Sequence, residues 1–241
     1  MIIETKNTVG EIVAEDFRTA AVFSKYGIDF CCKGNRTLEE VCEKKGISYD
    51  EILHRLSEAV EQTGEVTNYQ TWPEDLLIDY IEKKHHRYVE EKTPILMQYL
   101  KKIAAVHGGR HPELTEIYDI FMLSAGELAI HMKKEEFILF PFIKKMVAAK
   151  RDNEPIEPAK FGTVVNPVAM MKEDHDSEGE RFARIAQLTS NYTAPEDACS
   201  TYRVAFAMLE EFEQDLHHHV HLENNILFPK SLLLEKELRA A

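Results

Sequence analysis

The stretch HVHLENNILFP, residues 219–229, decides the fold of this chain because a similar stretch occurs earlier. Residues 131–141 read HMKKEEFILFP. The two copies align on one histidine and one glutamate each: His131 with His219, and Glu135 with Glu223. A helix places residues four apart on one face, and in both copies an apolar ILFP run follows. Each copy therefore predicts a helix that carries a His–Glu pair at the edge of a core.

A further histidine precedes each copy by a similar distance. His85, in KKHHRY, lies 46 residues before His131, and His175, in KEDHDS, lies 44 residues before His219. The second half of the chain thus looks like a copied helix pair. Two helix pairs bury their apolar stripes most simply as a four-helix bundle, in which matching residues of the two halves meet near the axis.

The composition is typical of a globular protein, with 29% charged and 44% hydrophobic residues among 241. Acidic residues (42) outnumber basic ones (29), and the net charge of -13 argues against unaided binding to nucleic acid or an anionic membrane. We expect neither a signal peptide nor a membrane span, because no apolar run approaches about 20 residues. Four cysteines, two of them adjacent, make a poor disulfide framework, which favours a reducing cytoplasm.

Turn residues and apolar spacing predict two helical domains. Residues 1–65 are expected to form short helices, one of them capped by Thr37 and ended by Gly46. The stretch TGEVTNYQ, residues 63–70, is expected to be a linker. Residues 72–241 carry four long helical patterns: 72–105, 112–149, 166–190 and 195–236. Strand alternation is absent, so the expected class is all-α.

Two further signals concern the course of the long helices. The spacing of Thr71 and Glu74 predicts a capping box at the start of the bundle. Three prolines lie inside the helical patterns, and each is expected to kink or end its helix: Pro94, Pro141 and Pro229.

An α-helical register separates inward from outward histidines. His219 shares a face with the apolar residues Leu209, Phe212 and Leu216, so we expect it to point into the core. The same test places five other groups inward: His85, His131, Glu135, His175 and Glu223. It places the remaining histidines on solvated faces or in loops: His54, His86, His107, His111, His217, His218 and His221.

Four histidines and two glutamates in one core indicate a metal site. Burying two carboxylates costs several kcal/mol each unless a cation compensates. Each glutamate can bridge two metals while the histidines divide two and two, and this N/O ligation suits non-haem iron, with manganese or zinc as alternatives. A mononuclear zinc site takes about four ligands and leaves two groups unexplained. A single HxxxE pair is more often an ordinary helix-surface pair, and its duplication is what favours metal.

Together with FCCKGNRTLEE, residues 30–40, these motifs resemble the iron-sulfur cluster repair di-iron proteins, the RIC or ScdA/YtfE type. The likeness covers nearly the whole chain, and the long connection between the second and third bundle helices is a departure. It implies a hemerythrin-like four-helix bundle preceded by a small helical domain. It also implies two non-haem iron ions per chain, oxo- and carboxylate-bridged, with these ligands: His85, His131, Glu135, His175, His219 and Glu223. Oxygen-carrying hemerythrins use five histidines instead.

The cysteines divide into two groups. Cys31 and Cys32 match the N-terminal cysteines of the family. Their position in a loop before Lys33 favours redox or iron-transfer thiolates, and the alternative is a buried apolar pair. Cys42 and Cys199 are expected to lie inside helices as packing residues.

Two acidic residues lie next to expected ligands. Glu127 is one turn before His131, and Asp174 directly precedes His175. The family has acidic residues near these places that are associated with access to the metals. The alternative is a pair of solvated helix carboxylates.

The resemblance implies a cytoplasmic protein that helps to repair iron-sulfur clusters damaged by nitrosative or oxidative stress, by supplying or handling iron. Two other functions stay open: reduction of nitric oxide at the di-iron centre, and reversible binding of O2 or NO. Expected partners are damaged iron-sulfur proteins, NO or O2 as small ligands, and a second copy in a homodimer.

Overall fold

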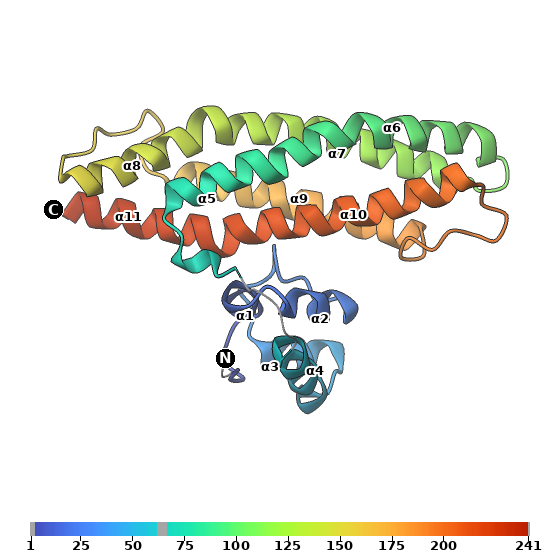
Figure 1. Ribbon diagram of the computed structural model, residues 1–241, viewed down its shortest axis with the longest axis horizontal. Coiled ribbons are helices and arrows are strands. Elements are labelled where there is room, and N and C mark those ends of the chain that lie inside the picture. The colour runs from blue at the N-terminus through green and yellow to red at the C-terminus, as the bar shows by residue number, and fades with distance from the viewer. Residues whose placement is uncertain (1–2, 62–66, 241) are drawn as a thin grey trace.

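The computed structural model describes residues 3–61 and 67–240, and its regular elements are all helical. Two isolated bridges are present in those ranges, but no strand is. The predicted all-α class is therefore confirmed. Of the predicted linker, residues 63–66 lie outside the described part of the chain. A small group of short helices packs beneath a long, narrow bundle (Figure 1).

The N-terminal group contains four short helices: α1 (Val9–Glu15), α2 (Thr19–Lys25), α3 (Leu38–Lys45) and α4 (Tyr49–Glu61). Thr37 caps α3 in a capping box with Glu40, as the sequence predicts. Gly46 ends this helix with a left-handed backbone, at φ 66°, which glycine adopts without steric strain.

The bundle consists of four rods, three of which combine several consecutive helical segments. A short 3-10 turn, η1 (Tyr69–Thr71), precedes them. The first rod joins α5 (Glu74–Tyr80), η2 (Ile81–His86) and α6 (Arg87–His107). The second joins α7 (Glu113–Lys134), η3 (Glu135–Leu139) and α8 (Phe140–Asp152). The third is α9 (Val165–Leu188). The fourth joins α10 (Ser200–Leu222), η4 (Glu223–Leu227) and α11 (Phe228–Ala240).

The start of the first rod differs from the prediction. The N-cap of α5 is Pro73, without a side-chain hydrogen bond, and the Thr71 hydroxyl donates to the carbonyl of Asn68 within η1. The predicted capping box of Thr71 and Glu74 is therefore wrong. None of the helices in the described ranges is both long and apolar enough to cross a membrane.

Three of the rods contain a π-helical segment: η2, η3 and η4. In η3 and η4 the amide of the residue that follows donates to the carbonyl of Glu135 or Glu223, five residues earlier. Such a segment adds one residue to a turn and shifts the register of everything beyond it. New α-helical segments begin just before Pro141 and Pro229, whereas α6 continues through Pro94. The helix therefore does not end at Pro94, and the alternative expectation of a kink there stays a prediction.

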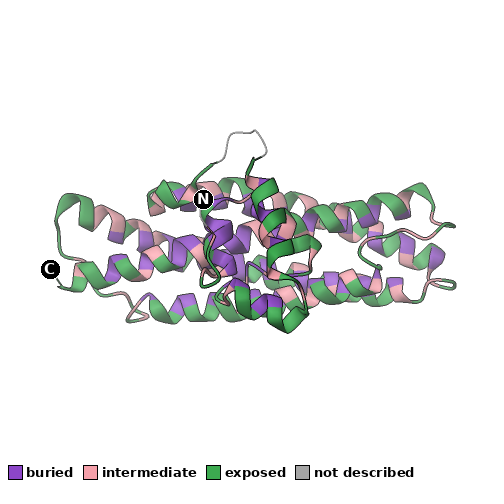
Figure 2. Cartoon of the chain, turned by 90° about the horizontal axis from the view of Figure 1, so that it is seen from below, coloured by how far each residue is buried: buried purple, intermediate pink, exposed green. Residues whose placement is uncertain are grey.

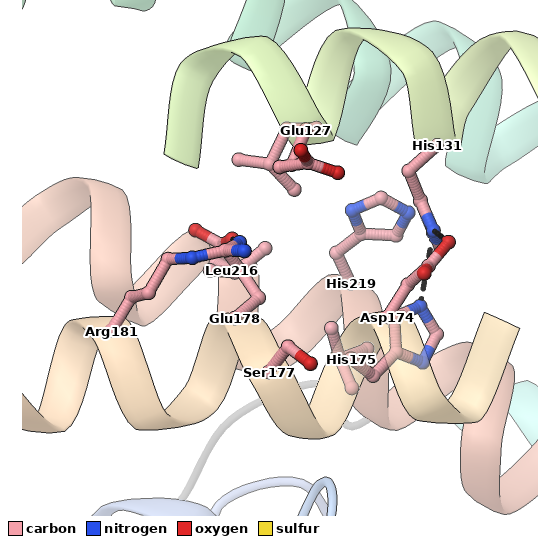
Figure 3. Close-up of a pocket in the computed structure, with 11 residues that line it drawn as sticks. Glu127, His131, Asp174, His175, Ser177, Glu178, Arg181, Leu216 and His219 are labelled. Carbon is pink, nitrogen blue, oxygen red and sulfur yellow. Dashed lines mark hydrogen bonds and ion pairs between the residues drawn. The ribbon is translucent and has the colours of Figure 1, made fainter. Parts of the chain in front are cut away.

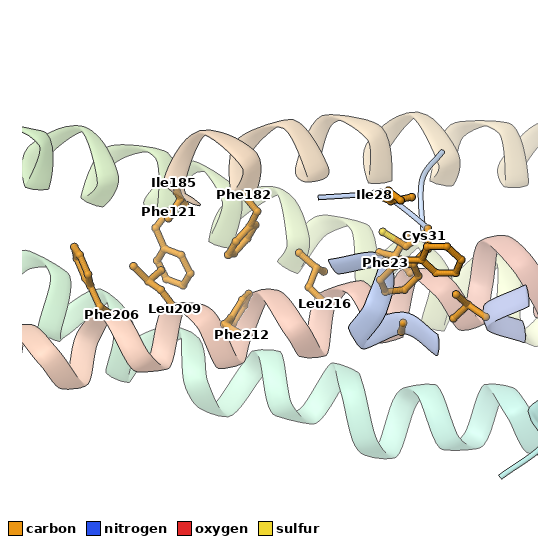
Figure 4. Packing of buried hydrophobic residues seen from close by; sticks show 14 of the residues in the cluster. Phe23, Ile28, Cys31, Phe121, Phe182, Ile185, Phe206, Leu209, Phe212 and Leu216 are labelled. Atoms are coloured by element: carbon orange, nitrogen blue, oxygen red, sulfur yellow. The ribbon is translucent and has the colours of Figure 1, made fainter. Parts of the chain in front are cut away.

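Apolar residues fill the bundle on both sides of a polar middle. One cluster contains a set of aromatic rings that pack edge to face and stacked (Figure 4): Phe121, Phe182 and Phe212. A second cluster lies toward α8 and α11 and includes Phe140 and Phe228. Buried residues face inward along all four rods (Figure 2). The polar side chains between the two clusters are thus buried in the packed interior of the bundle.

The N-terminal helices cover part of α10 and η4. Phe17 stacks on His218 at 3.9 Å between ring centroids, and Asn225 Nδ2 donates to the carbonyl of Phe30 at 3.1 Å. His221 is buried in this contact, and its predicted solvated position is wrong. A helical register reports which residues share a face, but the docking of a second domain decides whether that face meets water. Cys42 is buried inside α3, as predicted.

A half-buried carboxyl in α10 makes the stability of the bundle sensitive to pH. Burial raises the pKa of Glu213 to about 7, with a contact to Tyr192 opposing the rise and the charge of Glu210 adding to it. Because the folded pKa exceeds the unfolded one, the unfolded state loses its proton first. The free energy of unfolding therefore falls as pH rises from about 4.5 to 7 and is level above that.

We expect Glu213→Gln to relieve this effect. The stability advantage of the variant over wild type should grow by about 1–2 kcal/mol between pH 5 and pH 8. Urea unfolding of metal-free protein at both pH values measures it. Glu211→Gln, an exposed change on the same helix, is the control and should show no such growth. A constant difference for Glu213→Gln contradicts the raised pKa.

Candidate metal centre

Six buried side chains meet in the polar middle of the bundle and form two overlapping groups. The first contains His86, Glu135, His219 and Glu223. The second contains His131, Glu135, His175 and Glu223. Within each group the candidate ligand atoms lie within 4.8 Å of one another. Each of the four rods contributes to the centre, and both glutamates belong to both groups.

The distances show how the two glutamates connect the groups. Glu135 Oε2 lies 3.4 Å from Nε2 of both His86 and His131. Glu223 Oε2 lies 3.2 Å from Nε2 of His175, and Glu223 Oε1 lies 3.1 Å from Nε2 of His219. Each carboxylate therefore faces one histidine of each group. This is the geometry that lets a carboxylate bridge two neighbouring ions.

Five of the six predicted ligands lie in these groups, but His85 does not. His85 is buried and turned toward α10, where its Nδ1 is 3.0 Å from Asp215 Oδ2. Its neighbour His86 faces Glu135 instead and is only 1% exposed, so the predicted outward position of His86 is wrong. The cause is η2, because a π segment brings residues five apart onto one face and thus aligns Ile81 with His86.

The same shift acts in η3. An α-helical register places Ile138 on the face of His131, but Ile138 is 51% exposed and Leu139 is buried. In the second copy both corresponding residues are buried. For η3 and η4, the only corresponding feature of the sequence is the ILFP run that is repeated after each HxxxE.

The outer nitrogens of three candidate ligands have hydrogen-bond acceptors. Nδ1 of His86 is 2.9 Å from Glu136 Oε1, and Nδ1 of His131 is 3.3 Å from Asp174 Oδ2. Nδ1 of His175 is 3.1 Å from Asn224 Oδ1. Such acceptors place the ring proton on Nδ1 and leave Nε2 free to bind metal.

Glu136 and Asn224 are equivalent positions in the two copies, each directly after a bridging glutamate. Each orients a histidine from another rod, but one is charged and the other neutral. Asn224 also donates from Nδ2 to the carbonyl of Cys31 at 3.2 Å, which fixes the direction of its amide. The HxxxE motif did not predict these hydrogen bonds of Glu136 and Asn224.

The inner atoms of the centre fit a cation. Nε2 of His131 and Nε2 of His175 approach to 3.1 Å, close enough for one cation to contact both. Both oxygens of Glu135, Oε2 of Glu223 and Nε2 of His86 are buried without a hydrogen-bond partner. Buried polar atoms are otherwise nearly always paired, and a metal ion would pair all of them.

Contacts between the carboxylates and the imidazoles of the centre shift the pKa values of both. Burial, the largest influence, and the nearby Glu223 act to raise the pKa of Glu135, but His131 and His86 outweigh them and lower it. Burial acts to lower the pKa of His131, yet the charge of Glu135 raises it to about 9. A metal-free centre thus keeps its carboxylates ionised by holding protons on histidine. Metal binding replaces those protons.

A cavity of about 170 Å³ adjoins the centre between α7, α9 and α10 (Figure 3). His131, His175 and His219 form its inner wall, and Glu127 and Asp174 both line it. Asp174 also forms an ion pair with Lys134 at 3.0 Å. Both acidic residues therefore lie at the cavity that adjoins the candidate metal centre, and their expected role in access to metals stays a prediction.

A third acidic residue of the cavity was not expected from the sequence. Glu178, one turn beyond His175, is buried and contacts the hydroxyl of Ser124. Burial raises its pKa, although Arg181, 2.5 Å away, opposes the rise. The cavity therefore contains a buried carboxyl that keeps its proton to higher pH than an ordinary glutamate.

The vicinal cysteines lie against the rod that carries His175. Cys32 Sγ is 3.4 Å from the carbonyl oxygen of His175, and the two sulfurs are 3.7 Å apart. With Asp29 they form a third group whose ligand atoms lie within 4.8 Å. The hydrogen bond with Cys32 and burial raise the pKa of Cys31 well above its usual range. A thiolate at Cys31 is therefore disfavoured in this structure, and the redox or iron-transfer role of the cysteine pair stays a prediction.

The chain matches two family models. The hemerythrin HHE cation binding domain matches residues 77–231, and a domain of unknown function named ScdA_N (DUF542) matches residues 5–60. The iron-sulfur cluster repair protein ScdA of Staphylococcus haemolyticus is 30% identical, over 95% of this chain and 99% of its own length. The chain belongs to the ScdA/YtfE family of hemerythrin-like proteins.

Other relatives in this family are similar over nearly their full length. The iron-sulfur cluster repair protein YtfE of Musicola paradisiaca is 32% identical, over 94% of this chain and 96% of its own length. The protein of the same name from Escherichia coli O81 is 32% identical, over 93% of this chain and 96% of its own length. The bundle of the present ScdA/YtfE family member is thus a hemerythrin-like cation-binding domain, and the two overlapping His/Glu groups are its candidate site.

The choice between the two adjacent histidines can be tested directly. We expect His86→Ala to lower the metal content of the purified protein by about one ion per chain, because His86 is one of only two histidines in its group. His85→Ala should keep its metal, since its ring faces Asp215. Elemental analysis of both folded variants measures this. Loss of metal in His85→Ala alone contradicts the π-shifted register.

Proposed function

We propose that this protein holds two non-haem iron ions in its bundle and uses them in the repair of iron-sulfur clusters. The observation that carries this proposal is the overlap of two four-ligand groups on Glu135 and Glu223. A single ion cannot use both groups, and two ions would share the two carboxylates as bridges. A small oxo bridge would complete their coordination.

The type of ligand supports iron. Each group offers two imidazole nitrogens and two carboxylate groups, a mixed N/O set that suits non-haem iron, with manganese and zinc as weaker alternatives. The relatives are named iron-sulfur cluster repair proteins, a role that involves iron. The chain's contribution is to hold the ligands rigidly through Glu136, Asn224 and Asp174.

The position of the Cys loop supports a role in repair over simple storage of a gas. Cys32 touches the backbone at His175, and Asn224 links the Cys31 carbonyl to the ring of the same histidine. Sulfur ligands and the iron centre are thus joined through one residue. An iron ion that leaves the bundle would meet thiols there, and thiols suit transfer toward a sulfide-bearing cluster.

Reduction of nitric oxide is a second candidate function, favoured by the cavity. At about 170 Å³ it has room for small diatomic molecules beside His131, His175 and His219. Bound iron would supply the electrons for this chemistry. Glu178 lines the same cavity, burial raises its pKa, and proton uptake accompanies reduction of NO. Reversible O2 or NO binding would need no such proton and no Cys loop.

We also propose a cytoplasmic homodimer that acts on damaged iron-sulfur proteins. All four cysteines are free, which is the usual state in a reducing compartment. Leu123, Ile130 and Phe137 form an exposed apolar stripe at seven-residue intervals along α7 and η3. This spacing suits packing against a second helix, and the same surface of another copy would supply one.

We expect anaerobically purified protein to contain two iron ions per chain. Glu135→Ala or Glu223→Ala should loosen both, because each carboxylate belongs to both groups. Glu210→Ala, an exposed change on α10, serves as the control and should retain both ions. Elemental analysis and absorption spectra after oxidation provide the measurement. One tightly held zinc ion without oxo-bridge absorption contradicts the di-iron proposal.

The double change Cys31→Ala/Cys32→Ala tests the role of the thiols. We expect it to spare both bundle ions, since neither thiol belongs to the His/Glu groups, and to lower the reactivation of a cluster enzyme damaged by NO. Consumption of NO should persist in this variant if the second candidate function holds. Unchanged reactivation would remove the thiols from the repair mechanism.

A further inference from the structure

A cysteine and a histidine meet at the end of the bundle, far from the metal centre. Cys199 immediately precedes α10, and His107 is the last residue of α6. Cys199 Sγ lies 3.3 Å from His107 Nε2. About 21 residues of helix separate His107 from His86, which corresponds to roughly 30 Å. Figure 1 shows the end of α6 and the start of α10 side by side at this end.

Cys199 is neither inside a helix nor a packing residue, contrary to the sequence-based expectation. It is the N-cap of α10, with an extended backbone and an exposed side chain. Its sulfur therefore lies at the positive end of a 23-residue helix, where negative charge is favoured. The other cysteines are less accessible, because Cys31 and Cys42 are buried and Cys32 is half-buried.

The surroundings of His107 determine which of its nitrogens carries the proton. The side chain is 8% exposed, so its predicted solvated position is wrong, and its Nδ1 is buried without a hydrogen-bond partner. A proton on Nδ1 would leave a buried donor unpaired, which is rarer in proteins than an unpaired acceptor. The favoured neutral tautomer thus carries its proton on Nε2, and this N–H donates to Sγ of Cys199. Such a hydrogen bond is stronger when the acceptor is a charged thiolate.

A hydrogen bond from a buried imidazole, the end of a long helix and solvent access occur together at this one sulfur. The thiolate is the nucleophilic form of cysteine, and sites of this kind are selectively modified. We propose that Cys199 is a reactive thiol, activated by His107, that exchanges with low-molecular-weight disulfides to form a mixed disulfide. The proposed roles of Cys31 and Cys32 in cluster repair, and of the bundle in the reduction of NO, do not depend on Cys199.

The exchange needs only the Cys199 thiolate and the incoming disulfide. The Sγ thiolate attacks one sulfur of the disulfide, a new S–S bond forms, and the old S–S bond breaks. The second sulfur leaves as a thiolate and takes a proton from solvent. Cys199 is oxidised, and half of the disulfide is reduced to a thiol. A second thiol reverses the step by the same route.

The test uses the full-length, metal-loaded protein and glutathione disulfide at pH 7 under anaerobic conditions. Samples quenched with acid are digested, and the mixed disulfide at each cysteine is quantified by mass spectrometry over time. We expect Cys199 to react first, at a rate about tenfold or more above that of the other three cysteines. Faster modification of Cys32 than of Cys199 overturns the proposal.

The role of His107 is tested with two substitutions. His107→Asn removes the donor at the position of Nε2, and we expect the rate at Cys199 to fall by about threefold or more. The fall is moderate because the helix end and the access of solvent still favour reaction at this sulfur. His107→Gln places an amide N–H near the former Nε2 and should restore part of the rate. An equal rate in wild type and His107→Asn overturns the role of the imidazole.

A control separates activation from unfolding of this end of the bundle. His111 packs nearby but bonds to Asp197 and Glu113, and it has no bond to the thiol. His111→Asn should leave the rate at Cys199 within about twofold of wild type. Local unfolding in any variant would expose Cys199 further and raise its rate, which is the opposite of the expected fall. A fall of equal size in His111→Asn and His107→Asn also overturns the proposal.

Discussion

Two glutamates buried among histidines on the axis of a helical bundle are the constraint on which the rest of this structure depends. Glu135 and Glu223 have no exposure to solvent, and each faces two imidazoles. An unpaired buried carboxylate costs several kcal/mol, so such a core is stable only when positive charge is present beside it. Protons on histidine provide this in the metal-free protein, and bound cations provide it in the loaded one.

The backbone is adapted to this polar centre. Both glutamates begin a π segment, and a third π segment carries His86. Each extra residue turns the chain so that a ligand faces inward while apolar residues beyond it still meet the core. The apolar clusters on either side then hold the ligands in place, because their close packing permits little movement. The positions of the ligands therefore depend on the packing of the apolar clusters, and that packing depends on the π segments that carry the ligands.

The two halves of the bundle are alike in their ligands and different in what surrounds them. Glu136 orients His86 with a charged group, whereas Asn224 orients His175 with a neutral amide that also holds the Cys31 carbonyl. The N-terminal helices and the cavity both contact the half that contains His175. This asymmetry makes the two His/Glu groups chemically distinct, and only the group with His175 is connected to the thiols.

From the sequence alone, the helical class, the paired HxxxE motifs and five of the six residues in the two His/Glu groups could be predicted, because α-helical periodicity is a local property that repeats every few residues. His86 could not be distinguished from His85, since a π segment shifts the register by one residue and leaves no strong local signal. The burial of His221 depends on the docking of another domain, and the contact of Cys199 with His107 joins residues 92 positions apart. Such contacts between distant segments were decided only by the tertiary structure.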